Sequence, residues 1–131
     1  MVRVLIVEDE EADRMILGNI AQGMGHEVRF ASDGGEGLKA YAGGGIDVVV
    51  TDLHMPNVDG LELIGALQAL FPKAEIIAVS GKGTALLAAA ERMGVQTVLS
   101  KPVDPHELLR AIAEAAPDSS VPLSPQWIIT R

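Results

Sequence analysis

The chain has 131 residues, of which 48% are hydrophobic and 21% are charged, and this balance predicts one folded domain and not a disordered chain. The formal net charge of −8 argues against nucleic-acid binding, which depends on cationic side chains, and suits a cation or a basic partner surface. The absence of cysteine excludes disulfides and thiolate sites, and without an apolar run of membrane-spanning length or a signal peptide we expect a cytoplasmic protein that does not contact a membrane.

Strand-like apolar runs alternate along the chain with segments that have the spacing of amphipathic helices. The predicted strands are Val2–Val7, Glu27–Ala31, Ile46–Thr51, Glu75–Ser80 and Gln96–Ser100. The predicted helices are Glu11–Met24, Gly35–Ala42, Leu61–Leu70, Thr84–Met93 and Pro105–Ala116. Asp59 and Asp104 directly precede the third and fifth helices, where side chains that cap a helix N-terminus are expected.

Five β/α units in succession predict an α/β fold with a parallel sheet and helices on both faces. The first and third strands are almost wholly apolar, as central strands are, whereas the second alternates like an edge strand. This pattern fits a flavodoxin-like, doubly wound, five-stranded sheet of order 2-1-3-4-5, which binds ligands at the carboxyl ends of strands one and three. We assign residues 1–116 to this domain and 117–131 to a C-terminal tail or linker, with Trp127, Ile128 and Ile129 as its expected anchors.

Polar residues gather where the predicted strands end. Glu8 and Asp9 follow the first strand, and Asp52 follows the third. Because these strands should be neighbours, the three carboxylates should converge and repel one another unless a cation lies among them. Mg²⁺ prefers such oxygen ligands and keeps waters that a phosphate can share. With the Ser80 hydroxyl and the Lys101 ammonium at the same edge, the set suits phosphoryl transfer to Asp52.

Four motifs at these strand ends, LIVEDE, VVVTDLHMPNVDG, IIAVSG and VLSKP, resemble the receiver domain of two-component response regulators, including the chemotaxis regulators, from Val2 to about Ala116. The resemblance implies a phosphorelay protein that accepts a phosphoryl group on Asp52 from a histidine kinase or histidine phosphotransfer protein, with Mg²⁺. It implies a signalling phosphoacceptor and not an enzyme. Phosphorylation would switch the binding of a downstream protein through the face formed by the fourth helix, fifth strand and fifth helix, and a homodimer is possible.

The resemblance also implies roles for single residues. Asp9 and Asp52 would bind the metal with the backbone carbonyl of His54, and Glu8 would act mainly through metal-bound water. Ser80 and Lys101 would hold the phosphoryl oxygens, and the Lys101–Pro102 peptide bond would be cis.

Two side chains near the acceptor, His54 and Lys82, would modulate the lifetime of the phosphorylated state. The switch would involve Ser80 and Val98, but Val98 stands where the family has an aromatic residue and cannot turn a ring inward. We therefore expect phosphorylation to rearrange the loop after Ser80 and the helix that follows it, with little change at Val98.

Two other interpretations stay open: an interaction module that works without phosphorylation, and a small Mg²⁺-dependent phosphohydrolase. Phosphohydrolases with related sheets use two aspartates separated by one residue, and His54 stands at the second of these positions. Nucleotide-binding loops fit poorly. Gly83 follows Lys82 where a phosphate loop requires Ser or Thr, and acids replace the glycines of a dinucleotide-binding turn.

Overall fold

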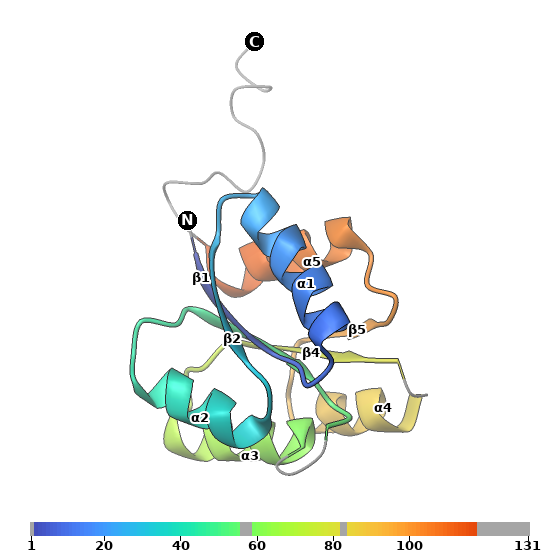
Figure 1. Ribbon diagram of the computed structural model, residues 1–131. Coiled ribbons are helices and arrows are strands. Elements are labelled where there is room, and N and C mark those ends of the chain that lie inside the picture. The colour runs from blue at the N-terminus through green and yellow to red at the C-terminus, as the bar shows by residue number, and fades with distance from the viewer. Residues whose placement is uncertain (1, 56–58, 82–83, 118–131) are drawn as a thin grey trace.

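The computed structural model describes residues 2–55, 59–81 and 84–117, which form a single parallel sheet covered by helices on both faces (Figure 1). The sheet has the order β2-β1-β3-β4-β5. Its strands are β1 (Arg3–Val7), β2 (Glu27–Ala31), β3 (Val48–Asp52), β4 (Ile76–Ser80) and β5 (Thr97–Ser100). The helices are α1 (Glu11–Gly23), α2 (Gly34–Ala42), α3 (Gly60–Leu70), α4 (Thr84–Arg92) and α5 (Pro105–Ala115). The predicted fold class and strand order are confirmed.

Two hydrophobic layers hold the helices against the sheet. Leu5, Val7 and Val49 face the layer under α2, α3 and α4, whereas Val4 and Ile6 face the layer under α1 and α5. Figure 1 shows the same division, with α1 and α5 on one side of the sheet and the other three helices on the opposite side. The central strands are therefore apolar at successive residues, because each face of the sheet buries its own set of side chains.

The predicted element boundaries lie within two residues of those in the structure. The largest difference for a strand is at β3, which was predicted to begin at Ile46 and begins at Val48. The Asp47 side chain there accepts a hydrogen bond from the Arg3 amide at 2.8 Å, so this carboxylate ends the ladder at the start of β1. The expected edge strand is β2, in which only Ala31 is buried.

The predicted helix caps are confirmed. The Asp59 carboxylate accepts a hydrogen bond from the amide of Glu62 at 2.8 Å, and that of Asp104 accepts one from the amide of His106 at 2.8 Å. These caps satisfy amides that lack a partner within the helix. The Lys101–Pro102 bond is cis, as the resemblance implies.

Several sequence predictions fall beyond the described ranges. Lys82 and the proposed tail anchors Trp127, Ile128 and Ile129 lie outside the described residues.

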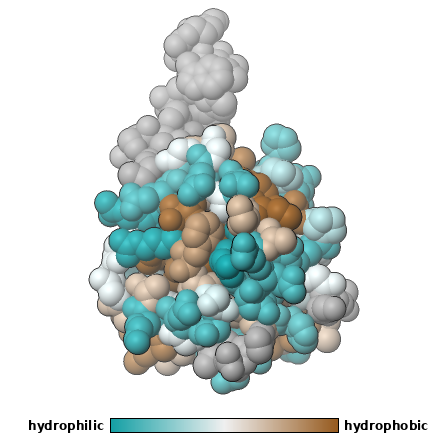
Figure 2. Space-filling model, viewed as in Figure 1, coloured by the Kyte–Doolittle hydropathy of each residue, from teal (hydrophilic) through white to brown (hydrophobic). Residues whose placement is uncertain are grey.

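Within the described residues, no helix has the length and apolar composition needed to cross a membrane. Figure 2 shows a mainly hydrophilic face that apolar atoms interrupt around α1, where Met15 is more than half exposed.

Gly60, the first residue of α3, allows that helix to start directly beside the end of β3. A Cβ atom at this position would overlap the backbone oxygen of Asp52 and lie 2.6 Å from the Cα atom of Leu53. Backbone atoms cannot rotate out of the way as a side chain can. Glycine is therefore required for α3 to pack this closely against the strand that carries Asp52.

We expect Gly60→Ala to lower the free energy of unfolding by about 1–3 kcal/mol, the usual cost of forcing an extra carbon into a filled site. Gly65→Ala is the matched control in the same helix, because its Cβ would meet only the Met93 Cε atom, at an ordinary 3.7 Å. Alanine favours a helix over glycine by about 1 kcal/mol, so the control should be neutral or stabilising. Urea unfolding followed by circular dichroism measures both variants, and equal stabilities would contradict this account.

Candidate functional site

The three acidic residues predicted to converge do so at the carboxyl ends of β1 and β3. These strands are direct neighbours, with Val7 in register with Thr51, so Glu8 and Asp9 emerge beside Asp52. One carboxylate oxygen from each of the three lies within 4.8 Å of the other two. The sheet order brings together residues that are more than forty positions apart in the sequence.

Burial makes this arrangement electrostatically costly. The Glu8 side chain is completely buried, Asp52 is 4% exposed, and Asp9 is partly buried. The pKa of Glu8 is raised to about 7, mainly by burial; the Asp52 charge also raises it, and the hydrogen bond from Lys101 lowers it. Burial also raises the pKa of Asp52, against the lowering effect of Lys101. The cluster is thus a place where added positive charge is stabilising.

Lys101 supplies positive charge from the end of β5. Its Nζ atom lies 2.7 Å from Glu8 Oε1, 2.9 Å from Asp13 Oδ2 and 3.6 Å from Asp52 Oδ1. Burial alone would lower the pKa of Lys101, but the hydrogen bonds to Glu8 and Asp13 carry it above its usual value. The ammonium therefore stays charged, with hydrogen bonds to Glu8 and Asp13 and with Asp52 close by.

Sequence reasoning missed two side chains that shape the site, both from the first turns of α1. Asp13 pairs with Lys101, as described above. The Arg14 Nη1 atom donates a hydrogen bond to the Glu8 carbonyl at 2.9 Å and one to the Asp9 carbonyl at 3.5 Å, which ties α1 to the loop that bears both acids. The signal for Asp13 was its place one helical turn beyond the acidic pair, whereas no pattern pointed to Arg14.

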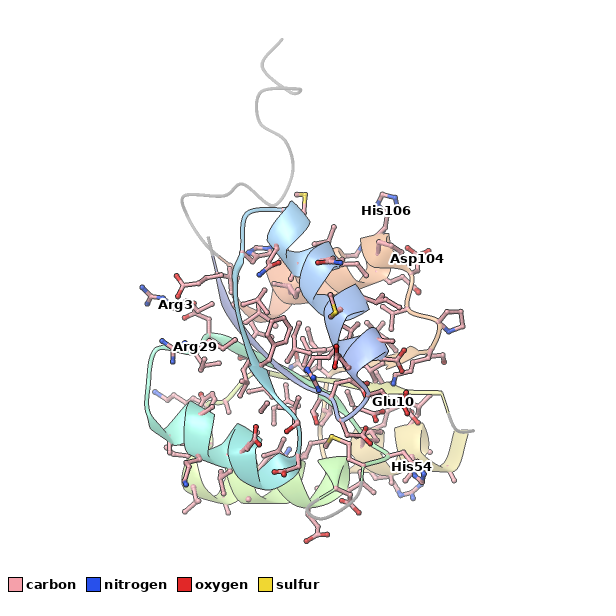
Figure 3. All side chains as sticks on the ribbon, viewed as in Figure 1. Arg3, Glu10, Arg29, His54, Asp104 and His106 are labelled. Atoms are coloured by element: carbon pink, nitrogen blue, oxygen red, sulfur yellow. The ribbon has the colours of Figure 1, made fainter. Side chains whose placement is uncertain are left out.

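The remaining predicted residues lie around the same edge of the sheet. Ser80 ends β4, is 1% exposed and stands in register with Ser100. Val98 is half-buried in β5 opposite Ala78, two residues before the carboxyl end of that strand. His54 is exposed, and Figure 3 shows it at the same end of the sheet as Glu10. The metal-binding role expected for the His54 carbonyl stays a prediction.

An open, polar cleft of about 390 Å³ gives access to Asp52. It is lined by Asp9, Glu10, Asp13, Asp52, His54, Gly81 and Lys101. The donor set of carboxylate oxygens, with open space for water beside it, fits Mg²⁺ better than a metal that prefers nitrogen or sulfur ligands. The Lys101 ammonium, which also lines the cleft, can bind an anionic oxygen, so the cleft suits a phosphoryl group.

Comparisons with known proteins agree with this geometry. The sequence profile of the family described as response regulator receiver domain matches residues 4–113. The chain is 33% identical to the transcriptional regulatory protein GlrR of Escherichia coli, over 98% of the chain and 30% of GlrR. It is similar to the crystal structure of a response regulator receiver domain protein from Clostridium thermocellum, with a TM-score of 0.82 and 29% identity over 88% of this chain and 94% of that one.

The response regulator TrrA of Thermotoga maritima, solved in complex with Mg²⁺ and BeF, is also similar. Its TM-score is 0.80, with 28% identity over 88% of this chain and 99% of TrrA. Solved receiver structures are thus matched over nearly their whole length. In contrast, the chain spans less than a third of the curated relatives GlrR and NtrC, at 30% and 25% of their lengths.

The raised pKa of Glu8 predicts how stability depends on pH when no divalent cation is present. The native protein holds this proton more tightly than the unfolded chain does, so its stabilising effect is complete below about pH 4.5 and is lost as the pH rises through about 7. Glu8→Gln should remove this dependence and stabilise the cation-free protein above pH 7, by up to about 3 kcal/mol.

Urea unfolding between pH 4 and pH 8 in the presence of a chelator provides the measurement. Glu114→Gln is the matched control, because it changes an exposed carboxylate on α5 that is remote from the cleft. The control should follow the parent at every pH. If Glu8→Gln also ran parallel to the parent, Glu8 would not be the titrating group.

Proposed function

The chain belongs to the response regulator receiver domain family, which is a family of signalling domains, and we propose that it takes up a phosphoryl group on Asp52 with Mg²⁺. The donor is the phosphohistidine of a histidine kinase or of a histidine phosphotransfer protein. Phosphorylation then changes the affinity for a protein target, which binds the face formed by α4, β5 and α5. The chain acts as a phosphoacceptor and not as an enzyme with a separate substrate.

The position of Asp52 is the observation that carries this proposal. The residue is only 4% exposed, yet it lines an open cleft at the end of a central strand. Two further carboxylates lie beside it, and the Lys101 ammonium lies 3.6 Å away. A carboxylate used only to cap a turn would not need this surrounding set of charges.

In the proposed transfer, a carboxylate oxygen of Asp52 attacks the phosphorus atom of the phosphohistidine. The new P–O bond forms as the P–N bond breaks, and the electron pair of the broken bond stays on the donor imidazole. The imidazole leaves as a neutral ring when its other nitrogen carries a proton. The product is an acyl phosphate on Asp52.

The chain's own side chains prepare this step. The Lys101 ammonium faces Asp52 and neutralises charge on the phosphoryl oxygens, and the Ser80 hydroxyl donates a hydrogen bond to one of them. Asp9 and Asp52, with Glu8 behind them and the His54 carbonyl beside them, would hold Mg²⁺. When bound, the ion supplies positive charge that offsets the repulsion among these carboxylates and the incoming phosphoryl group. TrrA, solved with Mg²⁺ and BeF, supports this assignment by similarity.

Asp52→Asn should abolish phosphoryl uptake and leave the fold intact, because the amide keeps the shape of the carboxylate but is not a nucleophile. Intact mass spectrometry after treatment with acetyl phosphate and Mg²⁺ tests this. Asp47→Asn is the matched control, since Asp47 is an exposed aspartate just before the other end of β3. It should gain one phosphoryl group as the parent does.

Phosphoryl uptake by Asp52→Asn equal to that of the parent would contradict the assignment of Asp52 as the acceptor. Target binding without uptake by the parent would favour the phosphorylation-independent module. Repeated turnover of a general phosphoester, beyond decay of the protein's own acyl phosphate, would favour a phosphohydrolase.

The metal assignment has a test of its own. Mg²⁺ should raise the Tm of the parent with increasing concentration, because a ligand that binds only the native state stabilises it. Asp9→Ala should lose this response, and Glu8→Gln should show it at higher Mg²⁺ concentrations. Glu11→Gln removes the same charge from an exposed neighbour and should respond like the parent. A parent-like response of Asp9→Ala would place the ion elsewhere.

A further inference from the structure

The Lys101 ammonium has a second anchor that the family motifs do not include. Its Nζ atom lies 2.9 Å from an oxygen of Asp13, a residue in the first turn of α1. On the basis of the function proposed above, we propose that Asp13 is a positioning residue for phosphoryl transfer: together with Glu8 it holds the ammonium of Lys101 facing Asp52 without bonding to it.

The distances from the Lys101 Nζ atom distinguish two carboxylates that accept a hydrogen bond from it and a third that does not. An ammonium group has three N–H donors. Glu8, at 2.7 Å, and Asp13, at 2.9 Å, lie within hydrogen-bonding range and take two of them. Asp52, at 3.6 Å, lies beyond that range. The third N–H is thus left for a phosphoryl oxygen that arrives on Asp52.

Two anchors are needed because the lysine stem is flexible. Glu8 is fixed by complete burial and by a hydrogen bond of 3.1 Å from the Glu10 amide to its second oxygen. A single anchor still lets the ammonium swing around it. Asp13 provides the second from a different element, on a rigid helix whose N-terminus favours acidic side chains.

The stem of Lys101 also packs closely against Gly81. A Cβ atom at Gly81 would lie 3.2 Å from the Lys101 Cβ atom, so this glycine lets the stem pass close to the end of β4. Gly81 therefore limits the path of the stem, and Glu8 and Asp13 hold the ammonium at its end.

Removal of Asp13 leaves Asp52 as the nearest alternative partner. A movement of less than about 1 Å would bring the ammonium into hydrogen-bonding range of the acceptor. That bond would stabilise the carboxylate before reaction and withdraw the donor from the place where charge develops on the phosphoryl group. Uptake should therefore slow, although one negative charge has been removed from a cleft that receives an anionic donor.

The test measures the rate of phosphoryl uptake from acetyl phosphate at saturating Mg²⁺ and constant ionic strength. Asp13→Asn should slow uptake by between about ten-fold and a hundred-fold, the usual effect of a small misplacement of a reacting group. Asp13→Glu keeps the carboxylate and should recover most of the rate. Glu11→Gln removes an equal charge from an exposed side chain of the same turn and should retain the parent rate.

A double-mutant cycle separates an effect through Lys101 from an effect of charge alone. Asp13→Asn should not slow uptake further in a Lys101→Ala background. Faster uptake by Asp13→Asn, or an equal slowing by Glu11→Gln, would show that Asp13 acts only through its charge, and would overturn the proposal. An undiminished effect of Asp13→Asn in the Lys101→Ala background would overturn it as well.

A crystal structure of Asp13→Ala, which removes the acceptor oxygen altogether, without divalent cations gives a readout that does not depend on transfer. The Lys101 Nζ atom should lie within about 3.2 Å of an Asp52 oxygen. An ammonium that kept its present position would overturn the role of Asp13. A parent protein that took up no phosphoryl group would contradict the proposed function instead, and the crystal structure would still decide the role of Asp13.

Discussion

Repulsion among three carboxylates at the end of a parallel sheet is the constraint on which the rest of the site depends. Adjacent parallel strands bring Glu8, Asp9 and Asp52 together, and burial removes much of the water that would screen their charges. The native protein accepts this cost because hydrophobic layers on both faces hold the strands in register. The Lys101 ammonium offsets part of the repulsion among the carboxylates, and a divalent cation is suited to offset the remainder.

The fold places these charges through close backbone contacts as well as through side chains. Gly60 lets α3 begin against the carbonyl of Asp52, and Arg14 ties the loop after β1 to α1. The acceptor strand and the acidic loop are thus each fixed by a neighbouring helix. Because these groups are already fixed, they would act on a phosphoryl group without a free-energy cost for reorganisation. Preorganised sites lower a reaction barrier in this way.

Much of this arrangement could be predicted because it follows from local sequence. The β/α alternation predicted a parallel sheet, and the apolar first and third strands with an alternating second strand fitted its order. Asp59 and Asp104 were identifiable as caps from position alone. The convergence of the acids then followed from topology. Asp13 and Arg14 could not be found in this way, because their partners depend on how α1 is oriented over the ends of the strands. Helix periodicity defines the face on which a residue lies, but not which distant side chain that face meets.

The end of the β4–β5 ladder offers a physical route by which phosphorylation could be sensed without an aromatic ring. The Lys101 amide donates a hydrogen bond to the Ser80 carbonyl at 3.1 Å, so the backbones of the two proposed phosphoryl-binding residues are joined directly. A phosphoryl group that attracts either side chain must therefore pull on both strand ends. Leu86 and Leu87 of α4 pack in the same hydrophobic layer as Val98, next to these strands. Because close-packed layers transmit small displacements, we expect movement of the joined strand ends to reach α4 through its packing, without a change of rotamer at Val98.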